Sequence, residues 1–271
     1  MKTPALFLAY LMLISFSGAI NIYGQSSSPV KPFGEPEFIQ DFLCSEVIYP
    51  ETELSEGIEG KVIISFTVEP DGQVSQFGLK ENISPGLDAE AVRLFGMLLW
   101  EPATEFGNPV RSVGEFPVDF NIKKYKKHCK ARGYERTELP FQPVDSSNIV
   151  YETGQTDRKP YPLFSEPGMS FNRFISQNIS YPETAYRQGI SGTVTLKFVI
   201  ETSGRASNIK IINPVGGGCS QEAIRLLKLL RWMPGIKGQG AVRTFMKIDI
   251  GFKLPENSEM NMFENSQMNP N

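Results

Sequence analysis

Residues 49–73 are YPETELSEGIEGKVIISFTVEPDGQ, and residues 181–205 are YPETAYRQGISGTVTLKFVIETSGR. The similarity continues without a gap to Phe120 and Phe252, at a constant offset of 132 positions, and 23 of the 72 aligned pairs are identical. One unit of a solenoid is shorter, roughly 20–50 residues. The chain therefore contains two similar small domains in tandem.

Each repeat begins with the pattern of a β-hairpin. Apolar residues alternate with other residues along the first strand, which favours a strand with one buried face. Gly72 and Gly204 then provide the turns, because glycine adopts positive φ easily. The apolar positions of the strand are Val62, Ile64, Phe66 and Val68 in the first repeat, and Val194, Leu196, Phe198 and Ile200 in the second.

A helix is predicted after each hairpin. Asp88 and Ser220 occupy equivalent positions and are the expected N-caps. Glu90 and Glu222 follow in the first turn, where the helix dipole favours negative charge. Apolar residues then recur at helical spacing and give one stripe for packing on the sheet. Each helix is expected to close at a tryptophan of the core, before a proline: Trp100 and Pro102, and Trp232 and Pro234.

A third strand is predicted at the end of each repeat, within Val110–Ile122 and Val242–Leu254. A short amphipathic helix is expected before each repeat, around Glu37–Leu43 and Met169–Ser176. The predicted fold class is α+β. It consists of two copies of a small ββαβ domain, each a three-stranded antiparallel sheet with helices on one face.

The N-terminus has the pattern of a secretory signal peptide. Lys2 precedes an apolar run that begins at Ala5, and Gly24 offers a small residue for cleavage before a polar segment. We expect residues 1–24 to be removed and the mature protein to act outside the cytoplasmic membrane. The alternative is an anchor formed by residues 5–23, whose length is near the lower limit for a membrane span.

Composition predicts the division of the remaining chain. We expect a linker at 25–35, domains at 36–124 and 168–256, a linker at 125–167 and a disordered tail at 257–271. The second linker is basic where it begins, around residues 123–132. A patch for an anionic surface is one interpretation, but a solvated linker is favoured because most charge runs face water.

The sequence offers little for catalysis or for metal binding. Its one histidine, His128, lies in the basic linker, and Gly216–Gly218 is not followed by the Lys-Ser/Thr of a phosphate loop. Cys44, Cys129 and Cys219 do not occupy equivalent positions, which excludes a disulfide framework shared by the repeats. A net charge of −3 provides no basic field for nucleic acid. We expect a non-enzymatic binding module without catalytic residues, metal or cofactor.

The ordered set of motifs resembles the C-terminal domain of TonB-family energy transducers. In the first repeat, Glu53 replaces the alanine of the family motif. The first repeat also contains Gly107-Asn108-Pro109-Val110, which is similar to the end of the family motif. The resemblance implies a periplasmic domain that binds a short extended segment of an outer-membrane receptor or another cell-envelope protein. In the second repeat it rests on Tyr181-Pro182, Ala185, Gly189, Gly192, Val194, Phe198, Ile200, Gly204, Ala223, Trp232 and Pro234.

Three features depart from such transducers. The N-terminus looks cleavable, the segment 25–36 is short for a spacer that crosses the periplasm, and there are two domains where one is usual. They indicate a soluble periplasmic relative that keeps the binding domain without the energy supply. The alternatives are a membrane-anchored transducer for outer-membrane import and a structural module that binds the envelope or the cell wall.

The predicted binding site is the edge of the second repeat's last strand, where an extended peptide can add by β-augmentation. Gly114 and Pro117 interrupt the equivalent strand of the first repeat, which should bind worse because proline lacks an N–H. The alternative is that the linker or the other domain covers both edges. The side chains expected to contact the partner are Arg243, Phe245, Lys247, Asp249 and Lys253.

Overall fold

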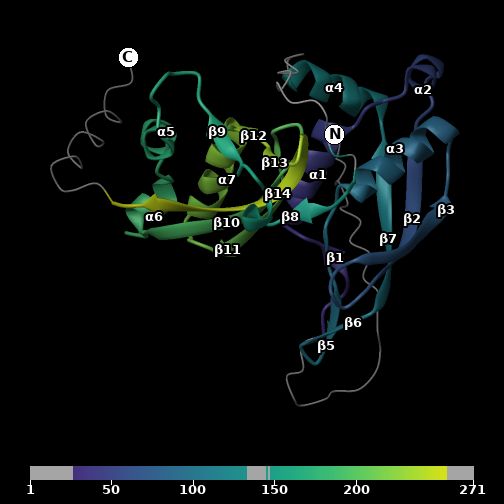
Figure 1. The fold of residues 1–271 in the computed structure, drawn as a ribbon, viewed down its shortest axis with the longest axis horizontal. Helices are drawn as coiled ribbons and strands as arrows, with labels where there is room; N and C mark the ends of the chain where they lie inside the picture. Colours follow the sequence, from purple (N-terminus) through teal and green to yellow (C-terminus); the bar gives the residue numbers. More distant parts are fainter. Residues whose placement is uncertain (1–26, 133–144, 146, 255–271) are drawn as a thin grey trace, which may run out of the picture.

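The computed structural model describes residues 27–132, 145 and 147–254 (Figure 1). The expected signal peptide and the expected tail lie outside the described residues. The first domain, with the helix that follows it, contains β1 (Lys31–Pro32), α1 (Pro36–Glu46), α2 (Glu51–Glu56), β2 (Gly60–Val68), β3 (Val74–Glu81), α3 (Pro85–Gly96), β4 (Trp100–Glu101), β5 (Ala103–Glu105), β6 (Asn108–Val110), β7 (Ser112–Phe120) and α4 (Ile122–Arg132).

The second domain repeats this order and includes strands from the segment before it. Its elements are β8 (Val150–Tyr151), the 3-10 helix η1 (Thr153–Gln155), β9 (Tyr161–Leu163), α5 (Phe171–Asn178), α6 (Glu183–Arg187), β10 (Gly192–Ile200), β11 (Ala206–Asn213), α7 (Cys219–Leu229), β12 (Arg231–Met233), β13 (Gly235–Lys237) and β14 (Gly240–Phe252). Both halves thus contain the predicted ββαβ unit, and α1 and α5 confirm the helices expected before it.

The two sheets share one topology and one register. The first has the antiparallel order β3-β2-β7, and β11-β10-β14 repeats it in the second. Gly60 lies opposite Phe120, as Gly192 lies opposite Phe252. The second sheet also gains β13, which folds back on β14, and β8, which pairs with β14 in parallel. The described part of the first sheet therefore has three strands, and that of the second has five.

The core of each domain lies between the sheet and its central helix. The ring centroids of Phe66 and Trp100 are 4.2 Å apart in the first domain, and those of Phe198 and Trp232 are 5.7 Å apart in the second. Full burial of one large apolar side chain stabilises a fold by about 1.5–3 kcal/mol. Both tryptophans are core residues, as predicted. They lie in β4 and β12, however, because α3 already ends at Gly96 and α7 at Leu229.

The predicted N-caps are wrong. Ser84 caps α3 by accepting a hydrogen bond from the Leu87 N–H, and Gly218 precedes α7 without a side-chain cap. Asp88 and Ser220 lie inside the first turn. There each accepts a hydrogen bond from the backbone five residues earlier, at 3.0 Å, and fixes the loop that leads into the helix.

Glu53, which replaces the alanine of the motif, supports the start of α3. Its carboxylate is buried and accepts hydrogen bonds from the Ser84 hydroxyl at 2.8 Å and the Gly86 N–H at 3.0 Å. The hydrogen bond from Ser84 lowers the pKa of Glu53 below its ordinary value. At the equivalent position Ala185 is buried against Gly217.

Much of the segment expected to be a linker has regular structure. Its basic beginning forms α4, which packs beside α1. Further along the chain, β8 joins β14 and β9 pairs with β12, so residues 150–163 belong structurally to the second sheet and its surroundings.

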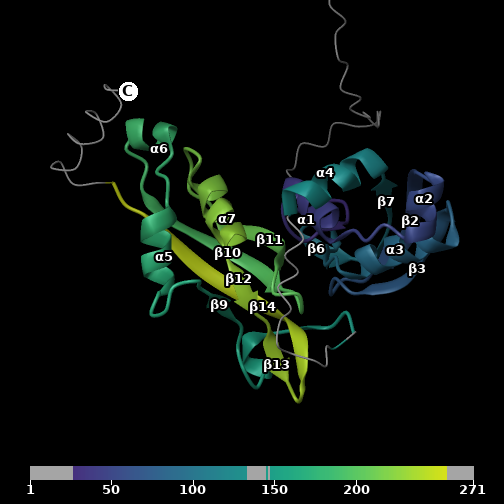
Figure 2. The same cartoon turned by 90° about the horizontal axis from the view of Figure 1, so that it is seen from above.

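The two domains are docked with different faces toward each other. Helix α1 of the first domain lies between them, next to β11 of the second, whereas β3 and α5 lie at opposite ends of the molecule (Figures 1 and 2).

Candidate functional site at the edge of the second sheet

One set of repeated polar residues closes the loop between the first two helices of each domain. In the first domain Glu90 accepts hydrogen bonds from the Ile48 N–H at 2.7 Å and from the Arg93 guanidinium, which also donates to the Glu46 carbonyl at 2.8 Å. Glu90 was predicted to lie in the first turn of the helix, but α3 begins at Pro85, so Glu90 lies in the second turn. Its contacts show that it holds the chain before Tyr49.

The second domain repeats this arrangement. Glu222 accepts from the Ser180 N–H at 2.6 Å and from Arg225, which donates to the Asn178 carbonyl at 2.6 Å. Burial opposes ionisation of Glu222, but the hydrogen bonds from Arg225 and Ser180 outweigh it and lower the pKa below its ordinary value. The repeated carboxylates therefore serve the fold.

The expected edge strand, β14, is covered over its first third. Strand β13 pairs with Gly240–Val242, and β8 pairs with Arg243 and Thr244. Strand β10 pairs with one side of β14 throughout Thr244–Phe252. In the part of the chain that the structure describes, no strand pairs with the other, outer side of Phe245–Phe252.

Strand alternation determines which backbone groups this edge presents. At the end of β10 the N–H and C=O groups of Glu201 both bond within the turn to β11, so odd-numbered residues of β10 face β11 and even-numbered ones face β14. Even-numbered residues of β14 lie opposite even-numbered residues of β10 and direct their N–H and C=O groups toward that strand, whereas odd-numbered residues direct theirs toward the outer edge. The outward N–H groups therefore include those of Lys247 and Asp249.

Three of the five predicted contact residues are exposed at this edge: Lys247, Asp249 and Lys253. Asp249 accepts a hydrogen bond from the Thr195 hydroxyl at 2.6 Å. Phe245 is half-buried and lies edge-on to Phe33 of the first domain, with 6.1 Å between ring centroids.

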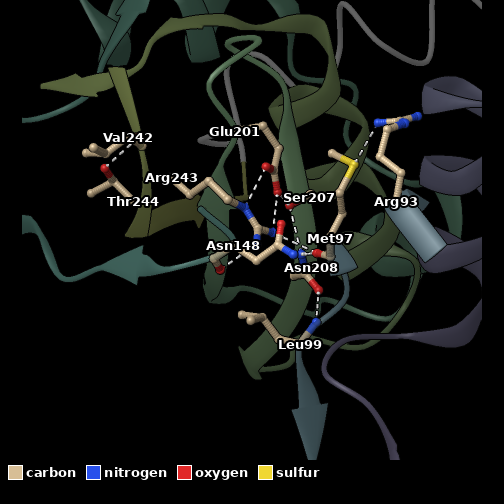
Figure 3. Close-up of polar contacts among 10 residues, drawn as sticks. All are labelled: Arg93, Met97, Leu99, Asn148, Glu201, Ser207, Asn208, Val242, Arg243 and Thr244. Atoms are coloured by element: carbon tan, nitrogen blue, oxygen red, sulfur yellow. Dashed lines mark hydrogen bonds and ion pairs between the residues drawn. The ribbon is translucent and has the colours of Figure 1, made fainter. Parts of the chain in front are cut away.

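Arg243, the fifth predicted contact residue, is buried between the domains. Its guanidinium binds both carboxylate oxygens of Glu201, at 2.8 and 2.9 Å, and donates to the carbonyls of Met97 at 2.7 Å and Asn148 at 3.0 Å (Figure 3). Ser207 donates to the same carboxylate. The side chain of Arg243 is thus committed to the domain contact.

Asn208 makes the neighbouring contact between the domains. Its side chain accepts from the Leu99 N–H at 2.9 Å and donates to the Met97 carbonyl at 3.0 Å (Figure 3). Its backbone is left-handed, with φ of 47°, at an irregularity in the pairing of β10 with β11. Asparagine tolerates this conformation better than most residues do.

This buried cluster was not predicted from the sequence. A signal for it exists, because glutamate, serine and arginine are identical in both repeats at these positions: Glu69, Ser75 and Arg111 in the first, and Glu201, Ser207 and Arg243 in the second.

The equivalent edge of the first domain is broken by its sequence. Strands β6 and β7 are separate where β14 is continuous, and β7 contains Gly114 and Pro117. Pro117 lies opposite Ile63 of β2. An incoming strand would find one N–H fewer along this backbone.

The described residues do not assemble a site for metal chemistry. Among them, no group of three His, Cys, Asp or Glu side chains could hold an ion. Cys44, Cys129 and Cys219 form no disulfide with one another. Burial raises the pKa of the Cys219 thiol, which disfavours the reactive thiolate. No helix in the described part is long and apolar enough to cross a membrane.

The sequence of each repeat matches one protein family. The family described as the Gram-negative bacterial TonB protein C-terminal matches residues 45–122 and again residues 177–254, together more than half of the chain. The chain belongs to this family and carries its domain twice. The domains of this family are associated with transport and are not enzymes.

Two solved structures illustrate the similarity. The TonB C-terminal domain of Helicobacter pylori is 21% identical, with 33% of this chain and 98% of that chain covered and a TM-score of 0.25. The TonB C-terminal domain of Pseudomonas aeruginosa is 22% identical, with 36% and 89% covered and a TM-score of 0.26. No curated protein sequence matches the chain.

Proposed function

We propose that this protein is a non-enzymatic component of TonB-linked transport that binds an extended segment of an outer-membrane receptor or another envelope protein. The single observation that carries the proposal is the unpaired outer edge of Phe245–Phe252 in β14. Membership of the TonB C-terminal family supports the link to transport.

The partner segment would add to β14 as a further strand. The outward N–H and C=O groups of residues such as Lys247 and Asp249 supply the main-chain hydrogen bonds. Three exposed side chains on the solvent face would contact alternate side chains of the segment: Lys247, Asp249 and Lys253. Because the exposed set has two cations and one anion, we expect an extended segment with an acidic residue opposite a lysine.

We further propose that the protein works in the periplasm after removal of residues 1–24. The apolar run and Gly24 support this, and the family domain is that of a periplasmic protein. N-terminal sequencing of the protein from its own cells tests it. A mature chain that starts near Gln25 is expected; an intact Met1 in the membrane fraction would favour the anchored transducer.

Site-specific photo-crosslinking in living cells tests the binding site. A photoreactive residue at Lys247 should capture the periplasmic segment of an outer-membrane receptor, whereas the same residue at Val113 of β7 should capture much less of it. Val113 is a matched control because it is exposed and lies on the equivalent strand. Equal capture at both positions would contradict the assignment of the edge, and capture of peptidoglycan-bound material alone would favour a structural module.

A further inference from the structure

The contact between the two domains joins two different faces. The helix face of the first domain consists of α1 and the residues that follow α3, Met97–Glu101. The hairpin face of the second domain consists of β11 and the cluster of Glu201, Ser207 and Arg243. A contact between unlike faces is heterologous, and its repetition between copies would give rings or open chains.

Backbone and apolar contacts hold this junction. The Glu35 N–H donates to the Ile209 carbonyl at 3.2 Å, so the chain before α1 bonds directly to the outer edge of β11. Gly34 approaches the same carbonyl, and a Cβ there would lie 2.7 Å from the oxygen. Phe38 of α1 packs against the core of the second domain, and Ile209 is only 3% exposed.

Among the residues that the structure describes, three ion pairs cross the junction. They join basic residues of the second domain to acidic residues of the first: Arg205 to Glu46, Lys210 to Glu101, and Lys228 to Asp41.

Since the domains are repeats, each also has the other face, and one of each kind is left uncovered. On the hairpin face of the first domain Phe77 occupies the position of Ile209 but is 56% exposed, and Leu79 on the same strand is 43% exposed. Strand β3 has no partner on its outer side among the described residues. On the helix face of the second domain, Leu229 occupies the position of Met97 and is 51% exposed.

The uncovered hairpin face already has the polar arrangement of the covered one. Ser75 donates to Glu69 at 2.6 Å, and Arg111 pairs with the same carboxylate at 3.1 Å. The Arg111 side chain is 58% exposed, whereas that of Arg243 is 5% exposed. Arg111 is therefore placed to donate to a carbonyl at the end of a central helix, as Arg243 donates to Met97.

We propose that the hairpin face of the first domain binds the helix face of the second domain of another copy of this chain, so that the protein associates head to tail. The second copy is the occupant because its helix face is built from the same repeat as the face that covers β11 within the chain. The uncovered faces, which include β3 and α5, lie at opposite ends of the molecule, as an open chain requires (Figures 1 and 2).

The charges explain why the chain prefers its own second domain for the internal contact. Gly78 and Gly96 stand at the positions of Lys210 and Lys228, and Asn178 and Met233 stand at those of Glu46 and Glu101. The contact between copies thus lacks the ion pairs and depends on Phe77, Leu79 and Leu229. It is weaker than the internal contact and depends on protein concentration.

Sedimentation velocity with two variants tests the proposal. The wild-type protein should associate as its concentration rises from about 5 µM to about 500 µM, a range suited to a small interface. Phe77→Glu places a charge on the hairpin face, and Leu229→Glu places one on the helix face. Each variant alone should therefore stay monomeric. An equimolar mixture should form a dimer and nothing larger, because each variant still supplies one intact face.

The controls separate this contact from other modes of association. Phe106→Glu, at an exposed position of the β5–β6 turn, should associate as the wild type does. Leu79→Lys replaces Phe77→Glu if thermal unfolding shows that the latter is not folded. A monomeric wild type over the whole range, a mixture that does not dimerise, or association lost in Phe77→Glu but kept in Leu229→Glu would overturn the proposal.

Discussion

The buried ion pair at the domain junction allows a prediction with an internal control. Arg243 makes four hydrogen bonds from a side chain that is 5% exposed, and its partner Glu201 is 3% exposed. Replacing Arg243 by Met leaves a buried carboxylate without its cation, which typically costs about 3–5 kcal/mol. The same change at Arg111, whose side chain is 58% exposed in its pair with Glu69, should cost about 0–1 kcal/mol.

Urea unfolding followed by tryptophan fluorescence measures both changes, because Trp100 and Trp232 report one domain each. In Arg243→Met the signal of Trp232, isolated by Trp100→Phe, should change at clearly lower urea. The double variant Glu201→Gln with Arg243→Met should recover part of the loss, since no unpaired charge remains. If Arg243→Met costs no more than Arg111→Met, the junction does not stabilise the protein as described.

Three further predictions concern the groups that hold the fold together. The lowered pKa of Glu222 stabilises the fold above its ordinary unfolded-state pKa of about 4.3. This contribution disappears as the pH falls through the lower folded-state pKa, so Glu222→Gln should flatten the acid side of a plot of unfolding free energy against pH; an unchanged slope would contradict this. Glu53→Ala should flatten the acid side of the same plot for the first domain, because the Glu53 carboxylate also has a lowered pKa. A slope equal to that of the wild type would argue against the role of Glu53 at the start of α3. Asn208→Ala and Asn208→Gly both lose the contacts to the first domain, but only alanine is strained in the left-handed conformation. Thermal unfolding should therefore show Asn208→Ala to be less stable than Asn208→Gly by about 1 kcal/mol. The reverse order would contradict the strain.

The sequence was sufficient to predict the repeated fold because local patterns and long-range packing agree within each unit. Alternating apolar residues, turn glycines and a helical stripe specify β10, β11 and α7 independently of the rest of the chain. The cap positions were misplaced because Asp88 and Ser220 bond back to the loop, and a capping residue and a loop-bonding residue have the same side-chain chemistry.

The candidate site was predictable only where its side chains alternate along one strand. Exposure of Lys247, Asp249 and Lys253 follows from that alternation. The burial of Arg243 does not, because it depends on how the first domain docks on β11. The strands β8 and β9 were also missed, since two or three residues give no periodicity and pair only with distant parts of the chain.

The central claim is that β14 receives an extended partner segment on its outer edge. Amide hydrogen exchange measured by NMR, with and without a synthetic peptide of the receptor segment identified by crosslinking, tests it most directly. Exchange at Lys247 and Asp249 is expected to slow at least about tenfold, the signature of new main-chain hydrogen bonds, while exchange at Ser112–Phe120 of β7 is unchanged. Protection that appears on β7 or β3 instead, or no protection on any strand at a saturating peptide concentration, would contradict it.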